Sequence, residues 1–222
     1  MPLKDIIRSQ SFFSSLKDQD LEQLASISLL HQYQKDYILY YENVDSPDLL
    51  FLCNGLAKAY KIDKHNNEIF LHYIYADSVI SEISNMNSEK LHSFSNIQLV
   101  DDSQVLSINY KKFHEYFLQK NRLVKEFTQE NIKRSLQLQS LVNREFIFDA
   151  VSKVSIMLHD DLEMFNRLKR HDISLMLHIQ PATLSRVLNR LKRNKIIDII
   201  HGQVTVINPI ALEEIYKDKT ND

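Results

Sequence analysis

The sequence predicts an α+β fold: an N-terminal antiparallel β-barrel or sandwich, a long helix and a C-terminal winged helix-turn-helix. Three observations support this prediction. Short apolar runs separated by turn-like pieces extend from Tyr37 to Ile108, a pattern typical of antiparallel sheets. From Tyr110 onward the pattern is helical, without Gly or Pro before Pro181. Residues 180–197 then combine positive charge with leucine and valine at helical spacing.

The composition is that of an ordinary globular protein. The chain has 222 residues, of which 44% are hydrophobic and 25% charged, which suits one large or two small domains. No apolar run approaches the ~20 residues that cross a bilayer. The N-terminal residues "MPLKDIIRSQSFF" lack the apolar segment of a signal peptide. We therefore expect a cytoplasmic protein.

The single cysteine, Cys53, lies in the apolar run "LLFLCNG". One cysteine excludes an internal disulfide and a four-cysteine metal or iron–sulfur site within one chain. We expect Cys53 to be a buried strand residue, because free cysteine is commonly buried.

The N-terminal half begins with helix and continues with strands. The segment "SSLKDQDLEQLASI" places Leu16, Leu21, Leu24 and Ile27 on one helical stripe. Strand-like runs such as "YILYY", "LAKAYKI" and "EIFLHYIY" follow. Asn54-Gly55 stands between two apolar runs, which predicts a tight hairpin.

A long helix is predicted over residues 122–142, after a short one around "KKFHEYFLQ". Its seam residues are Val124, Phe127, Leu138 and Leu141, interrupted by the polar residues Asn131 and Arg134. Polar seam positions in paired helices specify register at a cost in stability. The helix either packs on its own body or pairs with a second copy, and we favour pairing, with these six residues as the dimer interface.

The C-terminal segment has the order of a winged helix-turn-helix. Helices are predicted for "EFIFDAVSKVSIMLHDD", "RHDISLML" and "PATLSRVLNRLKRN", with a three-residue turn between the second and third. The following "IIDIIHGQVTVI" is apolar on both sides of His201-Gly202 and indicates a two-stranded wing.

Positive charge is concentrated in this segment. Residues 167–195 hold eight Lys or Arg against one acid, Asp172, a local balance of +7, whereas the whole chain carries −2. The remainder therefore carries −9. An acidic body with one basic module suggests a polyanion as the partner of that module.

The helix over 181–194 separates an apolar face from a cationic one. Leu184, Val187, Leu188 and Leu191 cluster on one side at 100° per residue. Such a second helix of a helix-turn-helix fits the major groove of DNA, where Arg, Asn, Ser and Ala all have partners on base edges. The predicted DNA-binding residues are Gln180, Ala182, Thr183, Ser185, Arg186, Asn189, Arg190 and Arg193.

The chain resembles the CRP/FNR family of bacterial transcription regulators over nearly its full length. The resemblance rests on "SFFSSLKDQDLEQLA", on "VLSINYKKFHEYF" and on the "T-x-S-R" of residues 183–186. The resemblance implies a cupin/jelly-roll-like β-barrel of the cyclic-nucleotide-binding type over residues 1–118. It further implies a dimerisation helix over 119–145 and a winged helix-turn-helix over 146–222. It also implies a homodimer on a palindromic operator in double-stranded DNA, with RNA polymerase as a further partner.

The sequence departs from the family pattern at several positions. Ala182 stands where the family usually has Glu, and His178 where the turn usually has Gly. In the sensor half, "VISEIS" keeps Glu82, but Ser93 and Phe94 replace the family's Arg-Ser pair. Leu138 and Gln139 replace its hydroxyl pair. A cyclic phosphate needs a cation or several N–H donors, so we do not expect cyclic AMP to be the effector.

No cofactor is required by the sequence. Oxygen-sensing relatives use four cysteines, and haem-sensing relatives use axial histidines, whereas the nine histidines here lack ligand-like spacing. His72 lies on a predicted barrel strand, so haem ligation stays a minor alternative to a hydrogen-bonded histidine. The candidate effector-pocket residues are His72, Glu82, Ser93 and Leu138.

Two other classes of function compete with a DNA-binding regulator. A barrel that binds an effector and regulates a protein partner has no need for a +7 stretch with Arg and Asn facing outward. An enzyme is not expected, because the sequence has no Gly-rich phosphate loop, no G-x-S-x-G and no H-E-x-x-H, and only two glycines.

Overall fold

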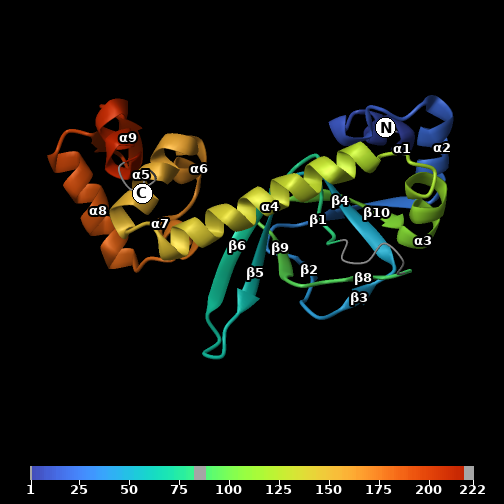
Figure 1. Ribbon diagram of the computed structural model, residues 1–222, viewed down its shortest axis with the longest axis horizontal. Coiled ribbons are helices and arrows are strands. Elements are labelled where there is room, and N and C mark those ends of the chain that lie inside the picture. The colour runs from blue at the N-terminus through green and yellow to red at the C-terminus, as the bar shows by residue number, and fades with distance from the viewer. Residues whose placement is uncertain (1, 83–88, 218–222) are drawn as a thin grey trace. The chain divides into compact units, whose positions relative to one another are not determined.

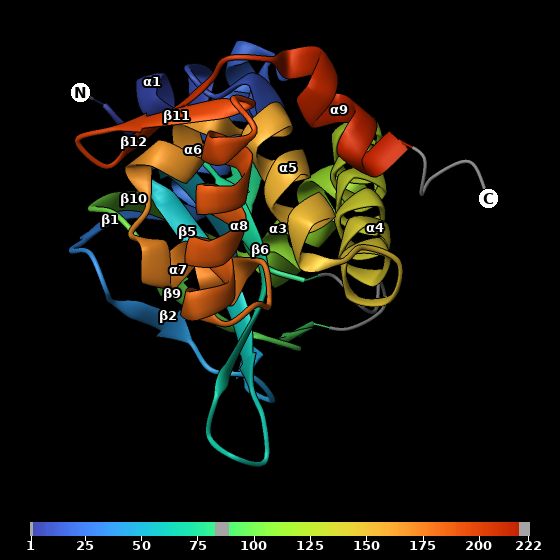
Figure 2. The same cartoon turned by 90° about the vertical axis from the view of Figure 1, so that its left-hand side faces the viewer.

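The computed structural model describes residues 2–82 and 89–217. The chain forms two compact units, one spanning residues 1–62 and 71–136, the other residues 63–70 and 137–222. Figure 1 labels most of the helices and strands of both, and Figure 2 labels the last two strands. The first unit contains the predicted barrel, and the second contains the predicted helix-turn-helix.

The barrel consists of two four-stranded sheets and one short ribbon. The first sheet has the order β1 (Ser28–Tyr33), β10 (Ser103–Asn109), β4 (Asp48–Asn54), β7 (Ser78–Val79). The second has the order β2 (Ile38–Tyr40), β9 (Asn96–Leu99), β5 (Leu56–Ile62), β6 (Glu68–Tyr75). The ribbon pairs β3 (Asp45–Ser46) with β8 (Leu91–His92). Pairs such as β1–β10, β10–β4 and β5–β9 are antiparallel, which confirms the predicted fold.

Strand β4 explains where the core lies, because successive side chains in a strand point to opposite faces. Leu52 joins a buried cluster that includes Val105 of the first sheet and Ile97 of the second. Its neighbour Phe51 joins a different cluster, formed with the N-terminal helices. The first sheet is therefore covered on both faces.

Asn54-Gly55 makes a tight turn, but not the predicted hairpin. It connects β4 to β5, and these strands belong to different sheets. Gly55 has a φ of +104°, and a Cβ there would overlap the side chain of Ser103. The pattern of apolar runs identified the turn correctly but could not show that the chain changes sheets there.

The N-terminal helices cover the outer face of the first sheet. They are α1 (Leu3–Arg8), the short η1 (Ser11–Phe13) and α2 (Asp18–Ser26). Leu21 and Leu24 are buried in the same cluster as Phe51. The rings of Phe13 and Phe51 lie 4.8 Å apart, centroid to centroid. Leu21 and Leu24 of the predicted stripe form the buried face of α2, whereas Leu16 and Ile27 lie just outside the helix and are partly buried against the same cluster.

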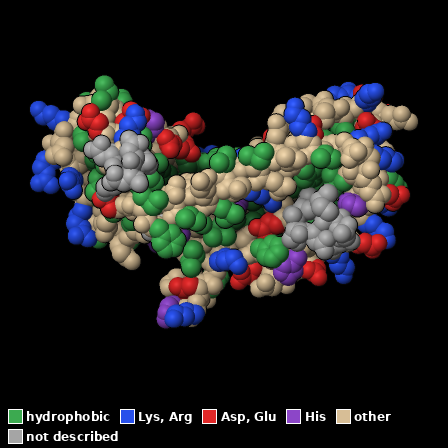
Figure 3. Space-filling view, viewed as in Figure 1, with side chains coloured by type: hydrophobic (Ala, Val, Ile, Leu, Met, Phe, Trp, Pro, Cys, Tyr) green, Lys and Arg blue, Asp and Glu red, His purple; other side chains and the backbone are tan. Residues whose placement is uncertain are grey.

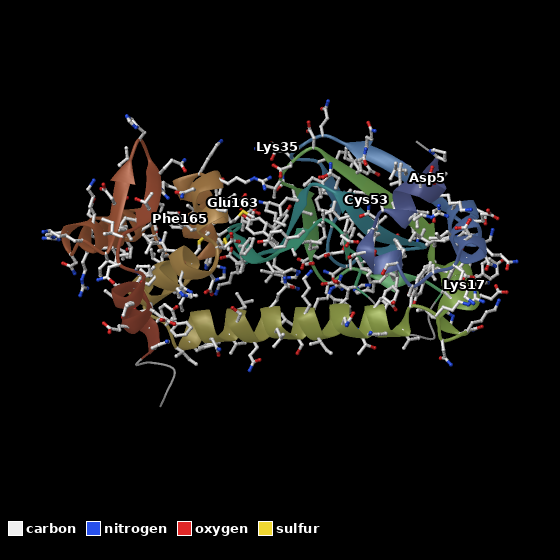
Figure 4. All side chains as sticks on the ribbon, turned by 90° about the horizontal axis from the view of Figure 1, so that it is seen from above. Asp5, Lys17, Lys35, Cys53, Glu163 and Phe165 are labelled. Carbon is white, nitrogen blue, oxygen red and sulfur yellow. The ribbon has the colours of Figure 1, made fainter. Side chains whose placement is uncertain are left out.

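Cys53 on β4 is buried, as predicted. Figure 4 labels it within the barrel. Burial raises the pKa of its thiol to about 11. The thiolate, which is the reactive form of cysteine, is therefore scarce at neutral pH.

After β10 come α3 (Tyr110–Phe113), the π-helical turn η2 (His114–Leu118) and the long helix α4 (Val124–Phe146). Helix α4 begins two residues after the predicted helix and ends four residues after it. Asn109 caps α3, because its side chain accepts a hydrogen bond from the backbone N–H of Lys112 at 3.1 Å.

Phe127 of α4 was predicted to lie in the dimer seam, but the structure buries it within its own chain. It is 8% exposed, and its ring lies 5.3 Å from that of Phe12 and 5.7 Å from that of Phe113. Arg134 also turns to its own chain, where its Nη2 donates to the carbonyls of Val79 at 2.7 Å and Ile80 at 3.2 Å. These two residues stabilise the helix on its own barrel, so they are not free to meet a second copy.

The second unit contains the remaining helices and a two-stranded ribbon. The helices are α5 (Ala150–Asp160), α6 (Leu162–Arg167), α7 (Arg170–Met176), α8 (Pro181–Arg193) and α9 (Pro209–Lys217). The ribbon pairs β11 (Ile197–Ile200) with β12 (Gln203–Val206). Leu184, Val187, Leu188 and Leu191 of α8 are buried, as predicted.

Helix α5 begins later than the predicted helix "EFIFDAVSKVSIMLHDD". Its first turn is capped by Asp149, whose side chain accepts from the backbone N–H of Ser152 at 2.9 Å, as N-cap aspartates do. The residues before Asp149 belong to α4 and a short turn. Among the described residues, no helix is both long and apolar enough to span a membrane.

Candidate DNA-binding surface

Helices α7 and α8 form the helix-turn-helix. The turn between them includes His178, which has a φ of +50°. This left-handed conformation is the one that glycine adopts most readily, and histidine is among the other residues that tolerate it. Pro181 is the first residue of α8, and the N–H groups of Thr183 and Leu184 donate to the Gln180 carbonyl. Proline suits this position, because its missing N–H would have no partner there.

The outward face of α8 carries the predicted DNA-binding residues. Thr183 is half-buried, and the others are exposed: Gln180, Ala182, Ser185, Arg186, Asn189, Arg190 and Arg193. Lys and Arg side chains gather along α8, at the left edge of Figure 3. The apolar face anchors the helix while its polar face stays open to a partner.

Two of these side chains are already ordered by their own helix. Arg186 donates from Nη2 to the hydroxyl of Thr183 at 3.2 Å and from Nε to the carbonyl of Ala182 at 3.3 Å. The Ser185 hydroxyl donates to the carbonyl of Pro181 at 3.1 Å. These hydrogen bonds are exposed to solvent, and such bonds contribute little net free energy. Base edges can therefore replace them at small cost.

Two cations of the basic stretch are used within the unit. Arg170 donates to the carbonyl of Gly202 at 2.6 Å, and its guanidinium lies 4.6 Å from the ring centroid of Phe165. Burial lowers the pKa of Arg170. Lys192 pairs with Asp198 at 2.9 Å, and this contact lowers the pKa of the Asp198 carboxyl. The cationic surface is thus narrower than the local charge of +7 indicates.

The predicted wing is present as β11 and β12, joined by His201 and Gly202. Both have positive φ, +50° and +82°, as two-residue hairpin turns require at their central positions. Sequence reasoning did not assign a role to Asp198. The one signal was an acid inside the apolar run "IIDII".

In the barrel, the Glu82 carboxylate is occupied by its own chain. It accepts the backbone N–H of Phe94 at 2.7 Å and the hydroxyl of Ser95 at 3.4 Å. The predicted segment "VISEIS" continues into Ile83 and Ser84, which lie outside the described residues. Burial, with a smaller contribution from the Glu82 charge, raises the pKa of the nearby Tyr40.

The other candidate effector-pocket residues occupy different positions. Ser93 is buried, and its backbone bonds to Asn43 and Val44. His72 lies on β6 and is half-buried, whereas Leu138 is exposed on α4. Among residues 2–82 and 89–217, no group of three or more His, Cys, Asp or Glu side chains is placed to hold a metal ion.

The part of the chain that carries this surface also matches known proteins. Residues 155–215, which contain the helix-turn-helix and the wing, match the family model described as a Crp-like helix-turn-helix domain. The protein is therefore a DNA-binding transcription regulator. Outside that domain, the chain is similar to CRP/FNR regulators in fold.

The relatives share the fold at low sequence identity. The global nitrogen regulator of Synechococcus elongatus is 19% identical over 196 residues, 83% of this chain and 88% of the relative. A CooA mutant from Carboxydothermus hydrogenoformans has a TM-score of 0.73 and 17% identity, covering 97% of this chain and 95% of its own. FixK2 from Bradyrhizobium japonicum has a TM-score of 0.68 and 16% identity, covering 85% and 96%. The likeness to these structures extends over most of the chain and thus includes the barrel.

Proposed function

We propose that the protein is a homodimeric, sequence-specific regulator that binds a palindromic operator. Residues 1–118 serve as the sensor, residues 119–145 as the dimerisation helix and residues 146–222 as the DNA-binding domain. The observation that carries this proposal is the exposed polar face of α8 together with an exposed apolar stripe on α4.

The α4 stripe replaces the seam expected from the sequence. It comprises the large hydrophobic residues of α4 that are each at least 42% exposed: Val124, Ile132, Leu136, Leu138, Val142 and Phe146. At 100° per residue they fall on one half of the helix. Ile132 lies far around the helix from the buried Phe127, whereas Leu138 lies at the edge of the stripe next to it. Scattered exposed hydrophobic residues are normal on a protein surface, but a continuous stripe marks an interaction site. A second copy of α4, with the same stripe, is the occupant we propose.

Base contacts are assigned to the outward residues of α8. Arg186 and Arg190 suit guanine, Asn189 suits adenine, and the Ala182 methyl suits the methyl group of thymine. Gln180, Thr183, Ser185 and Arg193 complete the proposed contact set. Ala182 stands where the family usually carries Glu, so the preferred base pairs are expected to differ from those of relatives that keep that Glu.

The operator is expected to be an inverted repeat. If two copies pair along α4, a two-fold axis relates their α8 helices, which must enter successive major grooves on one side of the duplex. Half-site centres should therefore lie ~10 bp apart. Footprinting on fragments selected from the genome of the source organism measures this spacing. Protection of a single asymmetric site would contradict the dimer.

Cyclic AMP is expected to leave DNA affinity and the melting temperature unchanged. The region where phosphate ligands would stand offers Ser93 and Phe94, and neither is a cation. Glu82 is occupied by the N–H of Phe94. Isothermal titration calorimetry with micromolar nucleotide checks this expectation. A saturable heat of binding would contradict it.

RNA polymerase is the protein partner included in this proposal, because a bound regulator changes transcription through the enzyme that reads the promoter. The proposed location is the cytoplasm, where bacterial DNA lies. The alternative, a barrel that regulates only a protein partner, gives no role to the exposed arginines of α8.

A further inference from the structure

The outer edge of the wing is closed by a side chain. Strand β12 pairs with β11 on one side. On its other side, the Asn166 side chain donates from Nδ2 to the carbonyl of Val204 at 2.9 Å and accepts the N–H of Val204 at 2.8 Å. A carboxamide has one donor group and one acceptor, like a peptide group. Asn166 of α6 therefore takes the place of a third strand at this edge.

Two further contacts attach the wing to the helix-turn-helix. Arg170, at the start of α7 and stacked on Phe165 of α6, donates to the carbonyl of Gly202 in the wing turn. Figure 4 labels Phe165. Lys192 of α8 donates to the carbonyl of Ile199 at 3.1 Å and pairs with Asp198, both on β11. The wing is thus attached to three helices.

These contacts place the wing along one flank of α8. Lys192 lies on the side of α8 next to its outward face, and β11 packs against the same helix (Figure 2). The major groove is ~12 Å wide, so a helix inside it has a phosphate backbone along each flank. A ribbon attached to that flank meets phosphates rather than base edges. The turn residues His201 and Gly202 are exposed, and a Cβ on Gly202 would meet open space.

We propose that Asn166 is a positioning residue that holds the wing so that its turn contacts the DNA phosphate backbone beside the base-reading helix. The proposal depends on DNA binding alone and does not require the homodimer. Phosphate contacts carry no sequence information. Loss of Asn166 should therefore weaken binding to every duplex by the same factor and leave base discrimination intact.

The test compares Asn166→Ala with the unchanged protein on the duplex selected by footprinting and on a scrambled duplex of equal length. Both affinities are expected to fall by the same factor, because phosphate contacts are the same on both duplexes. Hydroxyl-radical footprints should lose protection at flanking phosphates only. The matched control is Asn208→Ala, which removes a side-chain bond to the N–H of Ala211 at 3.1 Å without touching the edge of β12.

A second variant keeps the proposal testable if Asn166→Ala unfolds. His201→Glu places a carboxylate on the turn, where the side chain is exposed, so the unit should still fold. It is expected to lower both affinities equally, most strongly at low salt, because the carboxylate repels phosphate. Unchanged binding by His201→Glu overturns the proposal, and so does a loss by Asn166→Ala restricted to the selected duplex.

Discussion

Replacing Ile132 by glutamate is expected to separate the two subunits and to lower affinity for the full operator by about 10²–10⁴-fold. Ile132 lies within the α4 stripe and is exposed in the single chain, so the change should leave the barrel folded. Buried in a pairing interface, however, an unpaired carboxylate is strongly unfavourable. Each half-site is then bound separately, and the gain from linked binding is lost. Analytical ultracentrifugation and footprinting measure both effects.

Ser140→Glu is the matched control, because Ser140 is also exposed on α4 but lies to one side of the α4 stripe. It should remain dimeric and protect the whole repeat. Phe127→Glu is unsuitable as a test of pairing: Phe127 is buried in its own chain, and a charge there would destabilise the barrel. If Ile132→Glu stays dimeric and protects the same repeat, the α4 stripe is not the interface.

Arg186→Ala is expected to cost ~1–3 kcal/mol of binding free energy on the operator and much less on scrambled DNA. The reason is that a guanidinium can bond a guanine bidentately, whereas scrambled DNA offers that contact only by chance. The Arg186 guanidinium bonds only to groups of its own helix, so truncation should leave the fold intact. Fluorescence anisotropy on the two duplexes measures the difference.

Lys35→Ala provides the control for a lost positive charge, because Lys35 is an exposed lysine of the barrel. It should leave both affinities nearly unchanged. Equal losses by Arg186→Ala on the two duplexes would identify Arg186 as a phosphate contact. That result would also require a different residue to supply guanine recognition.

The DNA-binding unit was predictable because its signals are local. The four buried residues of α8 follow one helical period, and Pro181 and Gly202 mark a helix start and a turn. The left-handed backbone of His178 agrees with its place where the family's turn usually has Gly. What the sequence did not reveal was tertiary: Arg170 and Lys192 add to the local charge, yet each bonds a carbonyl of the wing.

The seam on α4 was partly mistaken for a related reason. A helix with apolar residues at heptad spacing has the same pattern whether the partner is its own barrel or another copy. Only the contacts of Phe127 with Phe12 and Phe113 distinguish the two. The change of sheets at Gly55 is equally long-range, because it depends on Ser103, far along the chain.

Phe127 and Arg134 together determine how α4 is turned about its own axis. They are seven residues apart, about two helical turns, so both face the barrel: one through aromatic rings, the other through the carbonyls of Val79 and Ile80. Two fixed points leave a rigid helix no rotational freedom. A molecule that moves strand β7 is therefore expected to turn α4 as well, and with it the α4 stripe that a second copy would meet in the proposed dimer. In the proposed dimer, a signal from the barrel is therefore expected to reach the subunit contact as a rotation of α4.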